Sequence, residues 1–87
     1  MNRLFIISVG SREIRGLISP GELPDVVINF YKMSESRGAN PDYLGDGVFV
    51  AVKQEVKLTL TVGDYHGPMP SRLLVEVLEE IMEEVFK

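Results

Sequence analysis

The chain of 87 residues contains no cysteine and only one histidine. Without cysteine it forms neither disulfides nor thiolate metal sites, which fits a reducing cytoplasm. One histidine falls short of the ligand set that zinc takes, and no acidic loop has calcium-binding spacing. Phosphate-binding glycine loops and nucleophile elbows are missing too. We therefore expect no metal and no cofactor, assign no catalytic residue, and rank an enzyme third, behind a protein-binding module and a small-ligand binder.

Long hydrophobic runs and clustered positive charge are also missing. No run approaches the roughly 18 apolar residues of a membrane span, so we expect a soluble, cytoplasmic protein without a membrane partner. The net charge is −4, and residues 71–87 alone carry two basic and five acidic side chains. This balance argues against nucleic acid as a partner, because phosphate binding needs clustered Lys and Arg.

What the chain does have is an ordinary globular composition, 45% hydrophobic and 25% charged, in a length suited to one domain. Residues 1–87 are therefore expected to form a single α+β domain.

The stretch from Pro70 to Lys87 shows the clearest helical period. Its apolar residues spread over half the helix circumference or more, which is wider than the stripe that a single sheet covers. The remaining narrow stripe holds five glutamates, several of them like charges at i,i+4. Pro70 and Ser71 are typical of a helix start. This helix therefore needs more cover than one sheet provides.

The first half of the chain reads mainly as strands. Leu4 to Val9 is short and rich in β-branched residues, and Ile14 to Ser19 fits an antiparallel partner after a turn. Asp25 to Met33 is predicted as a strand from its β-branched and aromatic composition, with a helix from Glu22 onward as the rival. Ser34 to Gly47 has three glycines, a proline and no period, which predicts a long loop.

In Val48 to Val62 the even-numbered positions are apolar except for Gln54. A hairpin with a two-residue turn would place Val52 opposite Lys57 and mix the faces, so we expect another arrangement. Either a three-residue turn keeps the faces consistent, or one bent strand runs through the segment and reaches a neighbour.

Together these segments predict an antiparallel sheet of four or five strands with one C-terminal amphipathic helix packed on one face. The even-numbered side of Val48 to Val62 is expected to meet the helix residues Leu74, Leu78, Ile81 and Val85.

The loop before the helix is the most site-like stretch, because it places a carboxylate, a phenol and the only histidine beside a helix N-terminus. Free amides there could hold an anion. A turn built of Gly, Asp, Tyr and Pro explains the same residues structurally. As a small-molecule site for an anionic metabolite or nucleotide, the candidate residues are Asp64, Tyr65, His66, Ser71 and Arg72, joined by Arg12 and Arg37.

The leading prediction for function is a small non-enzymatic protein-binding module that acts as a homo-oligomer, such as an adaptor, an inhibitor or immunity-type protein, or an assembly subunit. It depends on the wide apolar arc of the helix, for which a second copy in a dimer is the simplest cover. The glutamate stripe would lie at the rim, or would bind a basic protein surface. The predicted interface comprises Leu73, Val75, Val77, Met82 and Phe86, with Glu79 and Glu83 beside them.

Overall fold

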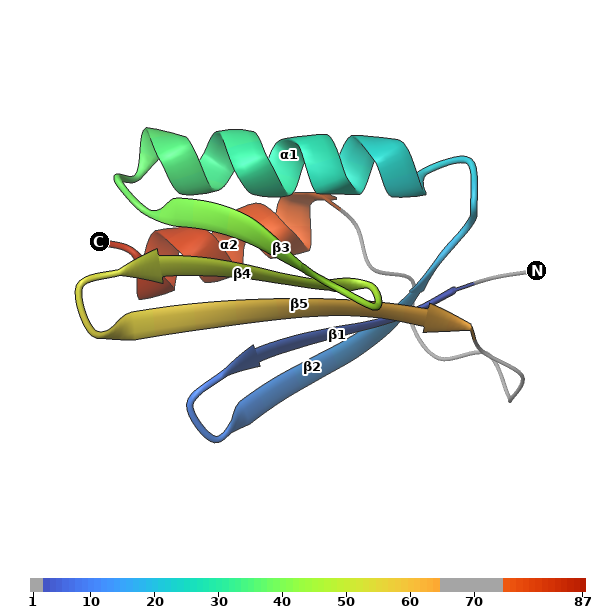
Figure 1. Ribbon diagram of the computed structural model, residues 1–87, viewed down its shortest axis with the longest axis horizontal. Coiled ribbons are helices and arrows are strands. Elements are labelled where there is room, and N and C mark those ends of the chain that lie inside the picture. Colours follow the sequence, from blue (N-terminus) through green and yellow to red (C-terminus); the bar gives the residue numbers. More distant parts are fainter. Residues whose placement is uncertain (1–2, 65–74) are drawn as a thin grey trace.

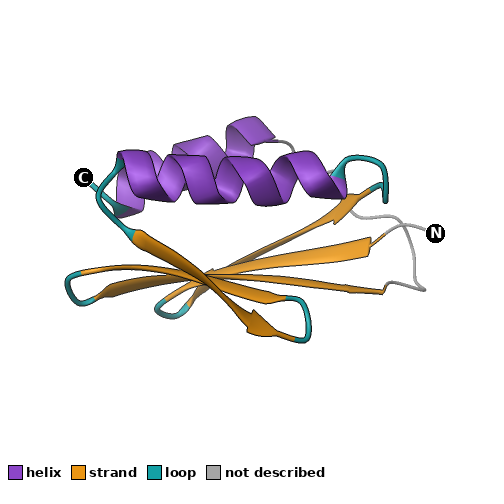
Figure 2. Ribbon diagram, turned by 45° about the horizontal axis from the view of Figure 1, so that its top comes forward, coloured by secondary structure: helices purple, strands orange, loops and turns teal. Residues whose placement is uncertain are grey.

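The computed structural model describes residues 3–64 and 75–87, and shows two helices packed on one face of a five-stranded antiparallel sheet (Figures 1 and 2). In chain order the elements are β1 (Arg3–Val9), β2 (Arg12–Ile18), α1 (Leu23–Ser36), β3 (Asn40–Gly45), β4 (Val48–Lys53), β5 (Val56–Asp64) and α2 (Val75–Val85). The strand order is β2-β1-β5-β4-β3. This confirms the predicted α+β fold, its antiparallel sheet and its C-terminal helix.

The segment predicted as a strand, Asp25 to Met33, is part of helix α1, so that prediction was wrong. The buried residues of α1 are Val26, Phe30 and Ser34, which repeat every four positions and face the core. Pro24 lies in the first turn, where its missing N–H costs nothing. Packing of this face against the sheet and α2 therefore overrides the β propensity of the segment.

The predicted long loop, Ser34 to Gly47, also proved wrong, because it contains β3. A two-residue turn at Asp46-Gly47 joins β3 to β4, and both residues have positive φ, 53° and 76°. Asp-Gly is a favoured pair for such turns, since both central positions of a type I′ turn need positive φ. Gly47 is fixed further by close packing, because a Cβ there would lie 2.3 Å from the Val62 carbonyl oxygen.

Val48 to Val62 forms a hairpin, in the register that the sequence argued against. Val52 lies opposite Lys57, and the two-residue turn begins at Gln54 with a φ of 56°. Each face stays consistent because the odd-numbered residues of β4 and the even-numbered residues of β5 face the helices. Ala51, for example, pairs with Leu58 under the helices. Of the expected helix residues, Leu78 and Ile81 share one core with even-numbered residues of β5, and Val85 packs against it, whereas the even-numbered residues of β4 lie outside that core. Leu74 falls outside the described residues.

The core lies between the helices and the covered face of the sheet. It includes Phe5 and Ile7 from β1, Leu58 and Leu60 from β5, and Leu78 from α2. Neither helix described by the structure is long and apolar enough to cross a membrane.

Candidate interaction surface

Most of the predicted ligand site lies outside the described residues: Tyr65, His66, Ser71 and Arg72. The backbone of Asp64 ends β5, opposite Arg3.

Arg12 lies at the other end of the sheet. Its cross-strand partner Val9 is roughly 20 Å from Arg3 along β1, at about 3.3 Å per residue. Arg37 follows the end of α1, which also lies at this far end (Figure 1). The structure therefore separates both arginines from Asp64, and an anion site near residues 63–72 stays a prediction.

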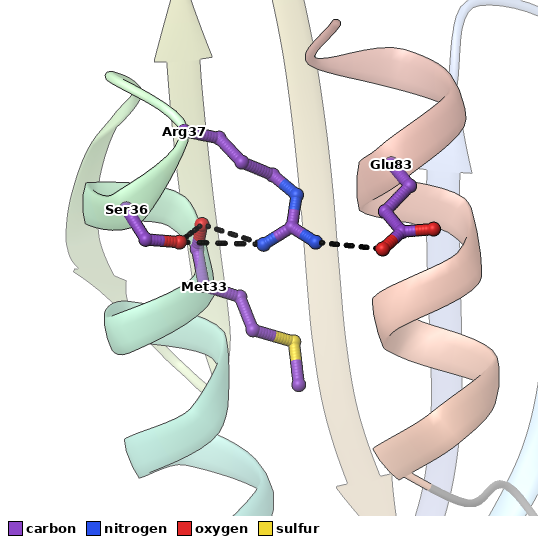
Figure 3. Close-up of polar contacts among 4 residues, drawn as sticks. All are labelled: Met33, Ser36, Arg37 and Glu83. Carbon is purple, nitrogen blue, oxygen red and sulfur yellow. Dashed lines mark hydrogen bonds and ion pairs between the residues drawn. The ribbon is translucent and has the colours of Figure 1, made fainter.

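Arg12 and Arg37 instead pair with glutamates of α2. The Arg12 guanidinium donates a hydrogen bond of 2.7 Å to Glu84, and this bond, together with the positive charge, lowers the pKa of the Glu84 carboxyl. Arg37, only 17% exposed, lies 3.5 Å from Glu83 and donates a hydrogen bond to the Met33 carbonyl (Figure 3). It thus satisfies an end carbonyl of α1 while joining α1 to α2.

The apolar flank of α2 that the sequence assigns to an interface is largely covered within one chain. Met82 is fully buried, and its sulfur lies 3.9 Å from the Ser34 hydroxyl of α1. Phe86 is 4% exposed, and Val75 and Val77 are half-buried against the core.

The other predicted interface residues lie elsewhere. Leu73 falls outside the described residues, Glu79 is exposed, and Glu83 faces Arg37. Helix α1 thus supplies the cover for which a second copy was invoked. Binding of a basic protein by the exposed glutamates stays a prediction.

Where α2 crosses β1 and β2, a small hollow is lined by Ile7, Val9, Ile14, Ile81 and Val85, with Arg12 beside them. Its one charged group is already paired to Glu84. Among the described residues no cluster of His, Asp and Glu could hold a metal ion.

Both helices lie on one side of the sheet, and no described element covers the opposite face (Figure 2). Side chains alternate between faces along a strand, and cross-strand partners share a face. Since Phe5, Ile7 and Ala51 face the helices, their neighbours point the other way. This open face therefore carries, among others, Leu4, Ile6, Leu17, Val48, Val50 and Val52, with Ser8, Thr59 and Thr61 between them and the exposed Lys57 opposite Val52 near the β4–β5 turn.

Exposure on the open face is uneven. Leu17 and Val50 are already buried, although neither belongs to the core under the helices. Leu4, Ile6 and Val48 are half-buried, and Val52 is 38% exposed. A solvated sheet face normally carries polar side chains, whereas strands buried on both sides are apolar at consecutive positions. Strands β1 and β4 have the second pattern, whereas the helices of residues 3–64 and 75–87 cover one side only.

The two edges of the sheet are protected against strand addition. On β3, Pro41 has no N–H, the Tyr43 N–H donates to Asp42 Oδ1 at 2.9 Å, and the register shifts before Gly45. On β2, Arg12, Glu13 and Arg15 are exposed charges. Bulges, prolines and charges are the features that keep edge strands from pairing with other chains.

The sequence reasoning missed the open face, although its signal was present. Leu4 to Ile7 and Val48 to Val52 are uninterrupted apolar runs, which is typical of strands covered on both sides. Comparison of the chain with family models, curated proteins and solved structures finds no match. Function is therefore argued from the surface alone.

Proposed function

We propose that this chain is a non-enzymatic protein-binding module that acts as a homo-oligomer, with the open face of the sheet as the contact between copies. The observation that carries the proposal is the pattern of β1 and β4, which are apolar on both faces while the helices cover one. A cytoplasmic location, consistent with the lack of cysteine, is part of the proposal.

The size of the open face suits a dimer. Five strands about 4.8 Å apart and about seven residues long, at about 3.3 Å each, give a face of roughly 550 Å² in projection. The accessible area of side chains exceeds their flat projection, which brings it toward the roughly 800 Å² per partner of a standard interface. Two such faces pack about 10 Å apart as a sandwich with nearly aligned strands.

Hydrophobic burial supplies the driving force. Leu4, Ile6, Val48 and Val52 retain exposed apolar area in one chain, and removing such area from water contributes about 25 cal/mol per Å². The threonines at the centre of the face, Thr59 and Thr61, are small enough to let two sheets approach. The charged groups once assigned to a ligand site, Arg12 and Arg37, are engaged by α2 glutamates instead.

The test is sedimentation equilibrium on the wild-type chain, on Ile6→Lys and on the matched control Ile28→Lys. Ile6 lies on the open face, whereas Ile28 is 48% exposed on α1. We expect a wild-type dimer at micromolar concentration that Ile6→Lys dissociates, because an unpaired ammonium would be buried between the sheets. Ile28→Lys should leave the dimer intact.

Far-UV circular dichroism shows whether the Ile6→Lys chain is folded, and Val48→Lys repeats the test from another strand. A wild-type monomer at these concentrations would refute the proposal. So would a dimer that persists in both open-face variants.

A further inference from the structure

We infer that two copies pack face to face with their two-fold axis running across the strands, so that β2 of one copy lies over β2 of the other. This inference rests on the proposed function, and it adds the orientation of the partner. It follows from how charges are arranged on the open face.

The strand register places the outward side chains in rows across the sheet. One row contains Arg15, Ile6, Thr61 and Val48. The next contains Glu13, Ser8, Thr59, Val50 and Asp42. These two rows cross the middle of the sheet, and their charged members lie at the edges: Arg15 and Glu13 on β2, Asp42 on β3. A third row, near the β4–β5 turn, adds Lys57 of the central strand β5 opposite Val52.

Aligned packing of two identical faces leaves two choices for the axis. An axis along the strands puts β2 over β3 of the partner and sets Glu13 over the partner's Asp42, once at each edge. An axis across the strands, midway between the rows, sets Glu13 over the partner's Arg15, again twice. The first choice brings carboxylates together and the second pairs opposite charges, as a self-complementary contact requires.

Apolar contacts do not separate the two choices. Val48 meets Ile6 of the partner subunit in one and Val50 of the partner subunit in the other. Within one chain Arg15 and Glu13 already lie 3.1 Å apart, and both are substantially exposed. In the across-strand arrangement the two pairs form a four-charge cluster of alternating sign. Charge at the β2 edge therefore decides the orientation.

The experiment uses two full-length variants, Glu13→Arg and Arg15→Glu, singly and mixed in equal amounts. Each single variant gives its own β2 edge one sign of charge, so each should self-associate about tenfold more weakly than wild type, as expected for two like-charge contacts at an exposed rim. In the mixture the two chains complement each other at both contacts. Native mass spectrometry should then show the mixed dimer well above the statistical half.

A matched pair on the exposed side of α1, Lys32→Glu and Glu35→Lys, should give dimers of wild-type strength and a statistical mixture. If the axis runs along the strands instead, Glu13→Arg alone should strengthen the dimer by pairing with the partner's Asp42, and the mixed dimer should not predominate. That result, in a wild-type dimer that Ile6→Lys still dissociates, overturns the orientation and leaves the proposed function standing. A dimer insensitive to Ile6→Lys and Val48→Lys overturns both.

Discussion

Replacing Met82 by Ala tests whether this residue belongs to the core of one chain or to an interface between two chains. The sequence places Met82 on an apolar flank that a second copy covers. In the structure its side chain is fully buried inside one chain, with its sulfur 3.9 Å from the Ser34 hydroxyl of α1. Phe30, also of α1, belongs to the same core. A core role predicts loss of stability, and an interface role predicts loss of association.

The expected magnitude follows from complete burial. Replacing a buried Met by Ala costs about 2 to 5 kcal/mol, because transfer free energy is lost and the cavity collapses only in part. A chain of 87 residues has a total stability of about 4 to 13 kcal/mol. Met82→Ala should therefore lower Tm by at least about 10 °C. Glu79→Ala, an exposed change on the same helix, should stay within about 0.5 kcal/mol.

Urea unfolding is the assay, carried out in the Ile6→Lys background so that association does not add to stability. The midpoint should fall while the slope stays constant, since the surface exposed on unfolding is nearly the same. The reasoning is refuted if Met82→Ala costs less than about 1 kcal/mol in that background while it weakens dimerisation of the otherwise wild-type chain. Met82 would then lie between copies.

Two further predictions concern the turn and the ion pair that shape the two ends of the sheet. Gly47→Ala should destabilise strongly, because its Cβ would lie 2.3 Å from the Val62 carbonyl oxygen, while Gly45→Ala, also at positive φ but with open space around it, should cost less by urea unfolding. The Glu84 pKa, measured by NMR titration, should lie below its ordinary value of 4.5 and rise toward it in Arg12→Gln. Because the folded pKa is the lower one, the small stabilisation from this pair is present above pH 4.5 and is lost as the pH falls through the folded value.

Periodicity was sufficient to predict α2, and short length, β-branched composition and the turn between them were sufficient to predict β1 and β2 as antiparallel strands. Periodicity was insufficient for α1. There Val26, Ile28 and Phe30 fit the face of a strand, while Leu23, Val26, Val27 and Phe30 fit the face of a helix. What decides is contact with α2 and the sheet, which local composition does not contain. Ser34, buried and donating to the Phe30 carbonyl, extended the helical face beyond the segment considered.

The predicted register of the hairpin between β4 and β5 was wrong for a different reason. A pairing of Val52 with Lys57 is unexpected if the apolar side chains of both strands must share one face. That requirement holds only when the second face of the sheet is solvated. The observed register gives the helices Ala51 and Leu58 and leaves Val50 and Val52 on the open face. The observed pairing of Val52 with Lys57 therefore itself indicates that both faces of the sheet carry apolar side chains.

Residues 25–33 form a helix where the sequence predicted a strand. As a result, the apolar surface that still needs cover lies on the sheet and not on the helices. As a strand, this segment would have left α2 alone on the sheet with both flanks bare. As α1, it lies beside α2 on the same face (Figure 2), and its Ser34 contacts the buried Met82, while Phe86 is buried in the same core. With both helices on one side, no other element in the described part of the chain packs against the outward apolar residues of β1 and β4. The case for self-association therefore depends on Ile6 and Val48 rather than on the helix flank, and a variant at either position tests it more directly than any substitution in α2.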